Sequence, residues 1–172
     1  MADDAATTER RPDRPLSPLG IGVVGATIII DQATKLVAER SLEFEQPIDL
    51  LPILSLYRVH NTGIAFSLLS DFGGIGLIAM ALVVTGLVLA IWQRTTDGGR
   101  LVAVGYALII GGALGNLADR LFYGHVVDFL LLHLGERPIF VFNLADTALT
   151  LGPALLIAVY FLPAGRSPDR AP

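Results

Sequence analysis

Long apolar runs separated by short polar segments dominate this chain and predict helices that cross a membrane. A membrane-spanning helix needs roughly 20 apolar residues. The runs of this kind lie at about residues 16–36, 72–92, 101–117 and 147–162. The second run holds 21 residues without a charged side chain. The first is the weakest, because its purely apolar part holds only twelve residues; it crosses only if Asp31 and Lys35 lie near one interface.

Between the runs, the pattern changes to one that is typical of short strands. Pro47 and Pro52 exclude a long helix in a segment that is rich in Ile and Leu. Residues 126–132 and 138–142, rich in Val, Ile, Leu and Phe, flank a short turn and predict a hairpin. The expected fold class is a polytopic α-helical membrane protein with four transmembrane helices and a small extracytoplasmic β-rich element.

This pattern predicts one membrane-embedded domain, residues 16–163, between two tails. Residues 1–15 and 164–172 form the tails, and residues 37–71 and 118–146 form the extracytoplasmic segments. The N-terminal tail has few large apolar side chains, which is a composition typical of disorder. In the third span, the spacing of Gly111 and Gly115 predicts close packing against another helix.

Composition supports the membrane assignment and excludes several classes of function. Apolar residues make up 53% of the chain, charged residues make up 16%, and the mean hydropathy is +0.63. The sequence has no basic cluster with interleaved aromatic residues, so no nucleic-acid partner is expected. It also has no cysteine, which excludes disulfides, thiol catalysis and cysteine-based metal sites.

The positions of the charges predict the orientation in the membrane. The N-terminal tail, the 93–100 loop and the C-terminal tail hold seven of the twelve Lys and Arg residues. Four spans place all three segments on one side, which the positive-inside rule makes cytoplasmic. The polar residues beside the spans then all fall at the outer interface, namely Asp31, Lys35, Asn61, Asn116, Asp119, Arg120 and Asp146. Independent helix ends would not need to gather in this way, whereas one shared site would.

Paired carboxylates are the chemistry that these residues support best. Two neighbouring aspartates share a proton, so that one activates water while the other polarises a peptide carbonyl. Asp128 lies between Val127 and Phe129, an apolar setting that favours a raised pKa. Asp146 begins a helix, where the dipole favours the ionised form. These opposite tendencies favour Asp128 and Asp146 over Asp31 and Asp119.

Other polar residues are suited to hold such a pair. Asn116 and Arg120 are four residues apart on one helix face, and Asn143 lies three residues before Asp146. Arg120 either holds a substrate carbonyl or pairs with Asp119.

Metal chemistry is the weaker alternative. His60, His125 and His133 all fall on the outer side, but no His-x-x-x-His spacing occurs. We interpret His125 and His133 as interfacial polar residues and expect no metal and no other cofactor. No Ser–His–Asp grouping is persuasive.

The chain resembles the lipoprotein signal peptidase (signal peptidase II) family over about residues 19–162. Five blocks carry the resemblance: Asp31-Gln32-Ala33-Thr34-Lys35, Asn61-Thr62-Gly63-Ile64-Ala65-Phe66-Ser67, the segment from Gly111 to Arg120, Val126-Val127-Asp128-Phe129, and Phe142-Asn143-Leu144-Ala145-Asp146. The resemblance implies a bacterial inner-membrane aspartic protease with Asp128 and Asp146 as its dyad. The supporting residues that it implies are Asp31, Lys35, Asn61, Asn116, Arg120 and Asn143. We add Asp119, which lies next to Arg120 in the third block, as a further supporting candidate.

The resemblance also implies a substrate and an inhibitor. The substrate class is a diacylglyceryl-modified prolipoprotein, cleaved at the lipobox cysteine, and the inhibitor class is the cyclic peptide globomycin. We expect a monomer surrounded by membrane lipid, with both termini cytoplasmic and the active site at the outer face.

Two alternatives come from other classes of protein. A small proton-coupled transporter would use Asp31, Lys35 and the late aspartates as a relay. The polar groups cluster at one interface, however, and the second and third spans are bare at the midplane. A structural membrane subunit would leave the one-sided clustering unexplained.

Overall fold

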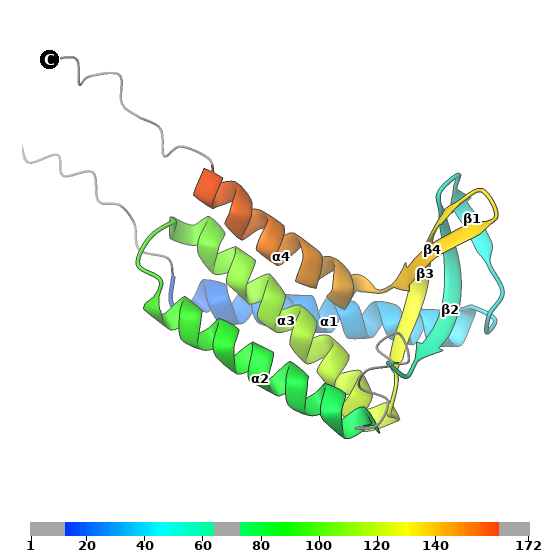
Figure 1. The fold of residues 1–172 in the computed structure, drawn as a ribbon, viewed down its shortest axis with the longest axis horizontal. Helices are drawn as coiled ribbons and strands as arrows, with labels where there is room; N and C mark the ends of the chain where they lie inside the picture. The colour runs from blue at the N-terminus through cyan, green and yellow to red at the C-terminus, as the bar shows by residue number, and fades with distance from the viewer. Residues whose placement is uncertain (1–12, 64–72, 162–172) are drawn as a thin grey trace, which may run out of the picture.

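The computed structural model describes residues 13–63 and 73–161, and within them the chain forms a helical bundle with a small sheet at one end (Figure 1). The helices are α1 (Pro18–Ser41), α2 (Gly73–Arg94), α3 (Gly99–Tyr123) and α4 (Leu144–Phe161). The strands are β1 (Ile48–Leu51), β2 (Leu54–Asn61), β3 (Val126–Leu134) and β4 (Arg137–Phe142).

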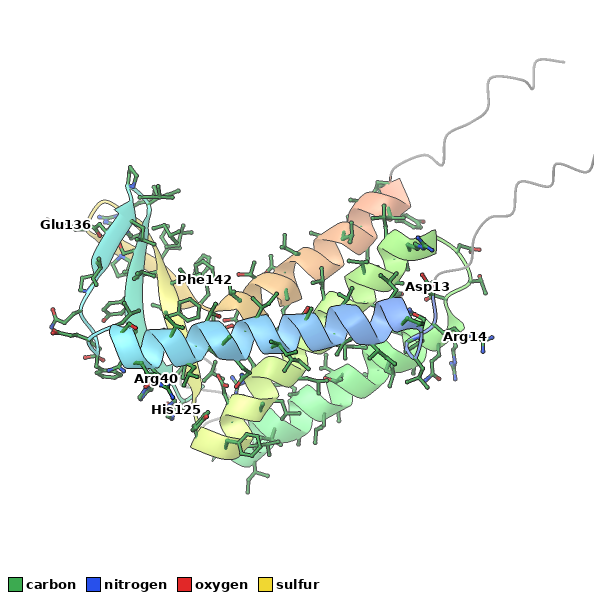
Figure 2. All side chains as sticks on the ribbon, turned by 180° about the vertical axis from the view of Figure 1, so that it is seen from behind. Asp13, Arg14, Arg40, His125, Glu136 and Phe142 are labelled. Carbon is green, nitrogen blue, oxygen red and sulfur yellow. The ribbon has the colours of Figure 1, made fainter. Side chains whose placement is uncertain are left out.

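All four helices are long and apolar enough to cross a membrane. They carry large apolar side chains on their outer surfaces: Val83, Leu87 and Ile157 are each more than half exposed. Figure 2 shows side chains projecting outward along the length of the bundle. A continuous apolar exterior of this kind is stable in lipid and not in water. The predicted fold class is therefore confirmed.

Helix α3 forms the centre of the bundle. In the most apolar 18-residue stretch of each helix, 67% of the residues of α3 are buried, compared with 17% in α1 and in α4 and none in α2. Small residues allow this central position, as the glycine spacing predicted. A Cβ at Gly115 would lie 2.6 Å from Asp31 Oδ2, and one at Gly111 would lie 2.7 Å from Thr27 Cβ. The glycines thus bring α1 and α3 close enough for their polar side chains to meet.

The sheet is antiparallel, with the strand order β1-β2-β3-β4. Its central pairing places Val59 opposite Asp128 and Asn61 opposite Val126. The predicted hairpin is present as β3 and β4. Figure 1 shows the sheet at the end of the bundle where α1 ends and α4 begins, with the α2–α3 turn at the other end.

Three helices extend beyond the predicted spans. Helix α1 continues from residue 36 to Ser41, α3 continues from residue 117 to Tyr123, and α4 begins at Leu144. The prediction ended the first and third spans soon after their first polar residues. Those residues have partners inside the bundle, so the helices continue through them. Gly124, the residue that follows α3, adopts a left-handed conformation with φ of 74° and ends the helix.

Candidate active site

Nine polar residues gather where the bundle meets the sheet, and we call them the polar cluster. They come from α1, β2, α3, β3 and the start of α4: Asp31, Lys35, Asn61, Asn116, Asp119, Arg120, Asp128, Asn143 and Asp146. Six of the nine are buried; among them, the exposed fraction ranges from 0% at Asp31 and Asn143 to 7% at Asn116. Buried polar groups are costly unless they are paired. The structure therefore brings together all nine residues that the sequence singled out.

Asp128 and Asp146 are held by shared asparagines. Asn143 Nδ2 donates to Asp128 Oδ1 at 2.7 Å, while its backbone N–H donates to Asp146 Oδ2 at 3.2 Å. The second oxygen of Asp128 accepts from Asn61 Nδ2 at 2.9 Å, and the second oxygen of Asp146 accepts from Asn116 Nδ2 at 2.7 Å. Both oxygens of each carboxylate are thus fixed in position, with Asn143 bridging the two groups.

The local sequence explains why Asn143 and Asp146 meet. Asn143 immediately precedes α4, and its Oδ1 accepts the backbone N–H of Asp146 at 2.9 Å. The carboxylate of Asp146 reaches back to the backbone N–H of Asn143. This reciprocal pair is a capping box, which forms between the residue before a helix and the third helical residue. The cap that starts α4 therefore also aims Asp146.

Lys35 forms the electrostatic centre of the supporting residues. Its Nζ lies 2.8 Å from Asp31 Oδ2, 2.8 Å from Asp119 Oδ2 and 2.9 Å from Asn116 Oδ1. The sequence left open whether Asp119 pairs with Arg120; the ion pair that the structure gives Asp119 is with Lys35. A buried cation between two carboxylates is strongly destabilising to remove, because the remaining charges lose their partner.

The two carboxylates beside Lys35 also connect the cluster to the surrounding backbone. Asp31 Oδ1 accepts the backbone N–H of Ala145 at 2.9 Å, and Asp119 Oδ2 accepts that of Val127 at 3.2 Å. Gln32 Nε2 donates to Asp119 Oδ1 at 2.8 Å. The two backbone bonds fix Val127 beside Asp128 and Ala145 beside Asp146. The sequence analysis did not name Gln32 as a site residue, although Gln32 stands beside Asp31 in the first block that carries the family resemblance.

Arg120 lies at the edge of the polar cluster. Its Nη1 donates to the backbone oxygen of Asn116 at 3.3 Å. Its buried Nε has no hydrogen-bond partner among the described residues. The guanidinium also interacts electrostatically with Asp146 and Asp128. The Nε–H of Arg120 therefore remains as a hydrogen-bond donor for a group that binds in the site.

Burial raises the pKa of Asp128 to about 6. The hydrogen bond from Asn61 opposes this rise, the charge of Asp146 adds to it, and Asn143 and Lys35 again oppose it. The apolar setting that the sequence predicted for Asp128 thus has the expected direction of effect. The opposite tendency predicted for Asp146 is wrong, because burial acts on that carboxylate in the same direction.

His133, which the sequence analysis considered as a possible metal ligand, lies outside the polar cluster. His133 Nε2 lies 2.8 Å from Ser55 Oγ, which donates to Asp49 Oδ1 at 2.6 Å. This is not a catalytic triad, because the aspartate contacts the serine, His133 Nδ1 faces the backbone oxygen of Gly135, and Ser55 is 1% exposed. Residues 64–67 of the second sequence block lie outside the described part of the chain.

Known proteins are similar to this chain in sequence and in fold. A family model described as Signal peptidase (SPase) II matches residues 23–162. The chain is 44% identical over 158 residues to a lipoprotein signal peptidase of Mesorhizobium japonicum, covering 92% of this chain and 94% of that protein. It is 46% identical over 140 residues to a lipoprotein signal peptidase of Brucella ovis, covering 81% and 88%.

A solved structure of a bacterial membrane enzyme has the same fold. Its TM-score is 0.76 at 23% identity, covering 90% of this chain and 98% of that chain. The family match extends from α1 to the end of α4 and includes every residue of the polar cluster. The chain therefore belongs to the signal peptidase II family.

Proposed function

We propose that this protein is an aspartic endopeptidase that removes signal peptides from diacylglyceryl-modified prolipoproteins, with Asp128 and Asp146 as its catalytic dyad. The observation that carries the proposal is the bridge through Asn143. It places two carboxylates side by side at the end of a membrane bundle, with all four of their oxygens oriented.

The dyad divides its work according to environment. Asp128, whose pKa is raised to about 6, serves as the protonated member and polarises the scissile carbonyl. Asp146 accepts hydrogen bonds from Asn116 Nδ2 and from the backbone N–H of Asn143, which favour its ionised form, and it takes a proton from water. The water oxygen then bonds to the carbonyl carbon, the C–N bond to the lipid-modified cysteine breaks, and the amine leaves with a proton from the dyad.

The rest of the polar cluster positions this chemistry. Arg120, whose Nε has no hydrogen-bond partner in the part of the chain that the structure describes, is suited to hold a carbonyl of the substrate backbone. Asn61, Asn116 and Asn143 orient the carboxylates without adding charge. The step needs neither metal nor another cofactor.

The orientation in the membrane follows from charge and parity. The cationic segments precede α1, join α2 to α3 and follow α4. The start of α1, the α2–α3 turn and the end of α4 lie at the end opposite the sheet in Figure 1. The positive-inside rule makes this end, which the cationic segments adjoin in the sequence, cytoplasmic. The active site then lies at the outer face of the bacterial inner membrane, where a lipid-anchored substrate and a globomycin-type inhibitor have access from the bilayer. The functional unit is a monomer.

Cleavage of a purified diacylglyceryl-modified prolipoprotein by the detergent-solubilised protein tests the proposal. Asp128→Asn and Asp146→Asn should each lower kcat by about a thousandfold or more, because removing one member of a catalytic set removes most of its effect. Asp49→Asn is the matched control, since Asp49 lies on β1 outside the polar cluster, and it should cleave normally. A chelator should have no effect. Substantial cleavage by either dyad variant would overturn the assignment.

No relative reported above supports the transporter alternative. The polar residues also lie together at one end of the bundle, whereas a relay needs groups across the midplane. Proton-driven flux in liposomes that survives Asp128→Asn would favour the transporter.

A further inference from the structure

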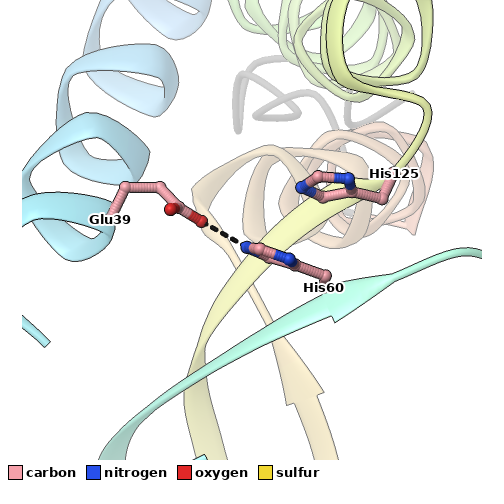
Figure 3. A group of neighbouring side chains, drawn as sticks. All are labelled: Glu39, His60 and His125. Carbon is pink, nitrogen blue, oxygen red and sulfur yellow. Dashed lines mark hydrogen bonds and ion pairs between the residues drawn. The ribbon is translucent and has the colours of Figure 1, made fainter. Parts of the chain in front are cut away.

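A second group of side chains, Glu39, His60 and His125, lies just beyond the polar cluster. Figure 3 shows them converging from the end of α1, the end of β2 and the residue before β3. His60 Nε2 lies 2.6 Å from Glu39 Oε1, and the rings of His60 and His125 stack with their centroids 4.0 Å apart. One potential ligand atom from each of the three residues lies within 4.8 Å of the others.

We propose that Glu39, His60 and His125 bind a divalent transition-metal ion of the Zn²⁺ class. Two imidazoles and one carboxylate form a donor set that zinc accepts, with a fourth position left for water. Metal–ligand distances of about 2.0–2.2 Å place tetrahedral ligand atoms roughly 3.4 Å apart. To reach this spacing, the 2.6 Å distance between Glu39 Oε1 and His60 Nε2 has to increase. Any distance between ligand atoms that approaches 4.8 Å has to decrease. Rotation of partly exposed side chains allows both movements.

A neighbouring arginine orients the carboxylate ligand. Arg58 Nη1 donates to the backbone oxygen of Glu39 at 2.6 Å and to its Oε2 at 3.2 Å. This leaves Oε1 directed at His60. Hydrogen-bond partners of metal-binding side chains commonly orient them in this way. The charge of Arg58 opposes a dication, so it favours a reversible site over a permanently loaded one. The two imidazoles select against Mg²⁺ and Ca²⁺, which prefer oxygen ligands.

The site is distinct from the dyad but shares its strands. Side chains alternate between the two faces of a strand. Asn61, which is hydrogen bonded to Asp128, therefore lies on one face of the β2–β3 pair, and His60 lies on the other. A metal ion held by His60 and His125 would link β2, the start of β3 and α1 directly behind Asn61. We assign the ion this clamping role and no step in the reaction.

The structure separates the histidines that the sequence analysis considered together. His133 contacts Ser55 at the far end of the sheet, whereas His125 joins His60. No spacing motif marks the cluster because its members come from three different elements.

Zinc titration of the full-length, tag-free protein in detergent tests the proposal. Isothermal titration should show saturable binding of one Zn²⁺ per chain, and Mg²⁺ should give no matching signal. His125→Ala and His60→Ala should each weaken Zn²⁺ binding by at least about tenfold, because each removes a ligand. His133→Ala is the matched control and should bind as wild type. Equal Zn²⁺ affinity in all four proteins, or no saturable binding by wild type, would overturn the site.

Thermal unfolding supplies a second readout that also shows whether each variant folds. Zn²⁺ should raise the unfolding midpoint of wild type and His133→Ala, and should leave those of His60→Ala and His125→Ala unchanged. A rise of equal size in every variant would place the zinc elsewhere. Asp128→Asn should retain Zn²⁺ binding, so failure of the metal site and failure of the proposed dyad give different results.

Discussion

Replacing Asp128 by Asn should make the stability of the protein less dependent on pH. The pKa of Asp128 rises from 3.8 in an exposed chain to about 6 in the fold. Between these two values the folded protein binds more protons than the unfolded chain, so the free energy of unfolding falls as pH rises through this window. A shift of about two pKa units corresponds to roughly 3 kcal/mol of lost stability above pH 6. Asparagine does not ionise and removes this loss.

The substitution also lowers the free energy of unfolding through a lost hydrogen bond, and this loss does not follow the titration of Asp128. Asn61 and Asn143 both donate to Asp128, but an asparagine side chain offers only one acceptor oxygen. One donor loses its charged partner, at a cost of about 1.5–3 kcal/mol. The informative quantity is therefore the difference between variant and wild type as a function of pH. This difference should move in favour of the variant by roughly 3 kcal/mol between about pH 4 and pH 7.

Thermal unfolding in detergent measures this difference. Trp92 is the only tryptophan in the chain and is 2% exposed, so its fluorescence reports unfolding of the bundle. A change of 1 kcal/mol shifts the midpoint by about 2–4 °C in a chain of this size. The gap between the two proteins should therefore change by roughly 6–12 °C across the pH range. A gap that is independent of pH, or one that changes in the opposite direction, would refute the burial argument for Asp128.

Three further substitutions test the geometry of the site. Asn61→Ala removes a hydrogen bond that favours ionised Asp128, so the pKa of Asp128 should rise and the high-pH limb of kcat/KM should move upward by about one unit; a limb that stays or moves downward contradicts the role of Asp128 as the acid. Lys35→Met should lower the free energy of unfolding by about 3–5 kcal/mol, because two buried carboxylates lose their cation; a chemical unfolding curve close to that of wild type contradicts this. Gly115→Ala should cost about 1–3 kcal/mol, since its Cβ would lie 2.6 Å from a carboxylate oxygen of α1. Gly22→Ala, where nothing lies within 4 Å, is its control and should be neutral or stabilising.

The features that the sequence predicted correctly depend on neighbours along the chain. Span length and apolar content determine whether a helix can cross a membrane, so all four helices were predictable. The alternation of Val, Ile, Leu and Phe with turn residues revealed the β3–β4 hairpin. With four spans that alternate in direction, the polar residues at the span ends all fall at the same interface, so their proximity was predictable. The three-residue spacing of Asn143 and Asp146 was also visible in the sequence, and the structure shows that this pair caps α4.

Tertiary structure decided which polar groups from different elements meet. Lys35 lies four residues after Asp31 on α1, so that ion pair is local, but only the close approach of α1 to α3 at Gly115 also brings Lys35 to Asp119. Helix α3 continues to Tyr123 because its polar side chains have partners across the bundle, which no hydropathy pattern records. The meeting of Glu39, His60 and His125 likewise depends on three elements. The physical reason is that hydrophobicity and capping act within a few residues, whereas burial of charge is settled by distances between segments far apart in the chain.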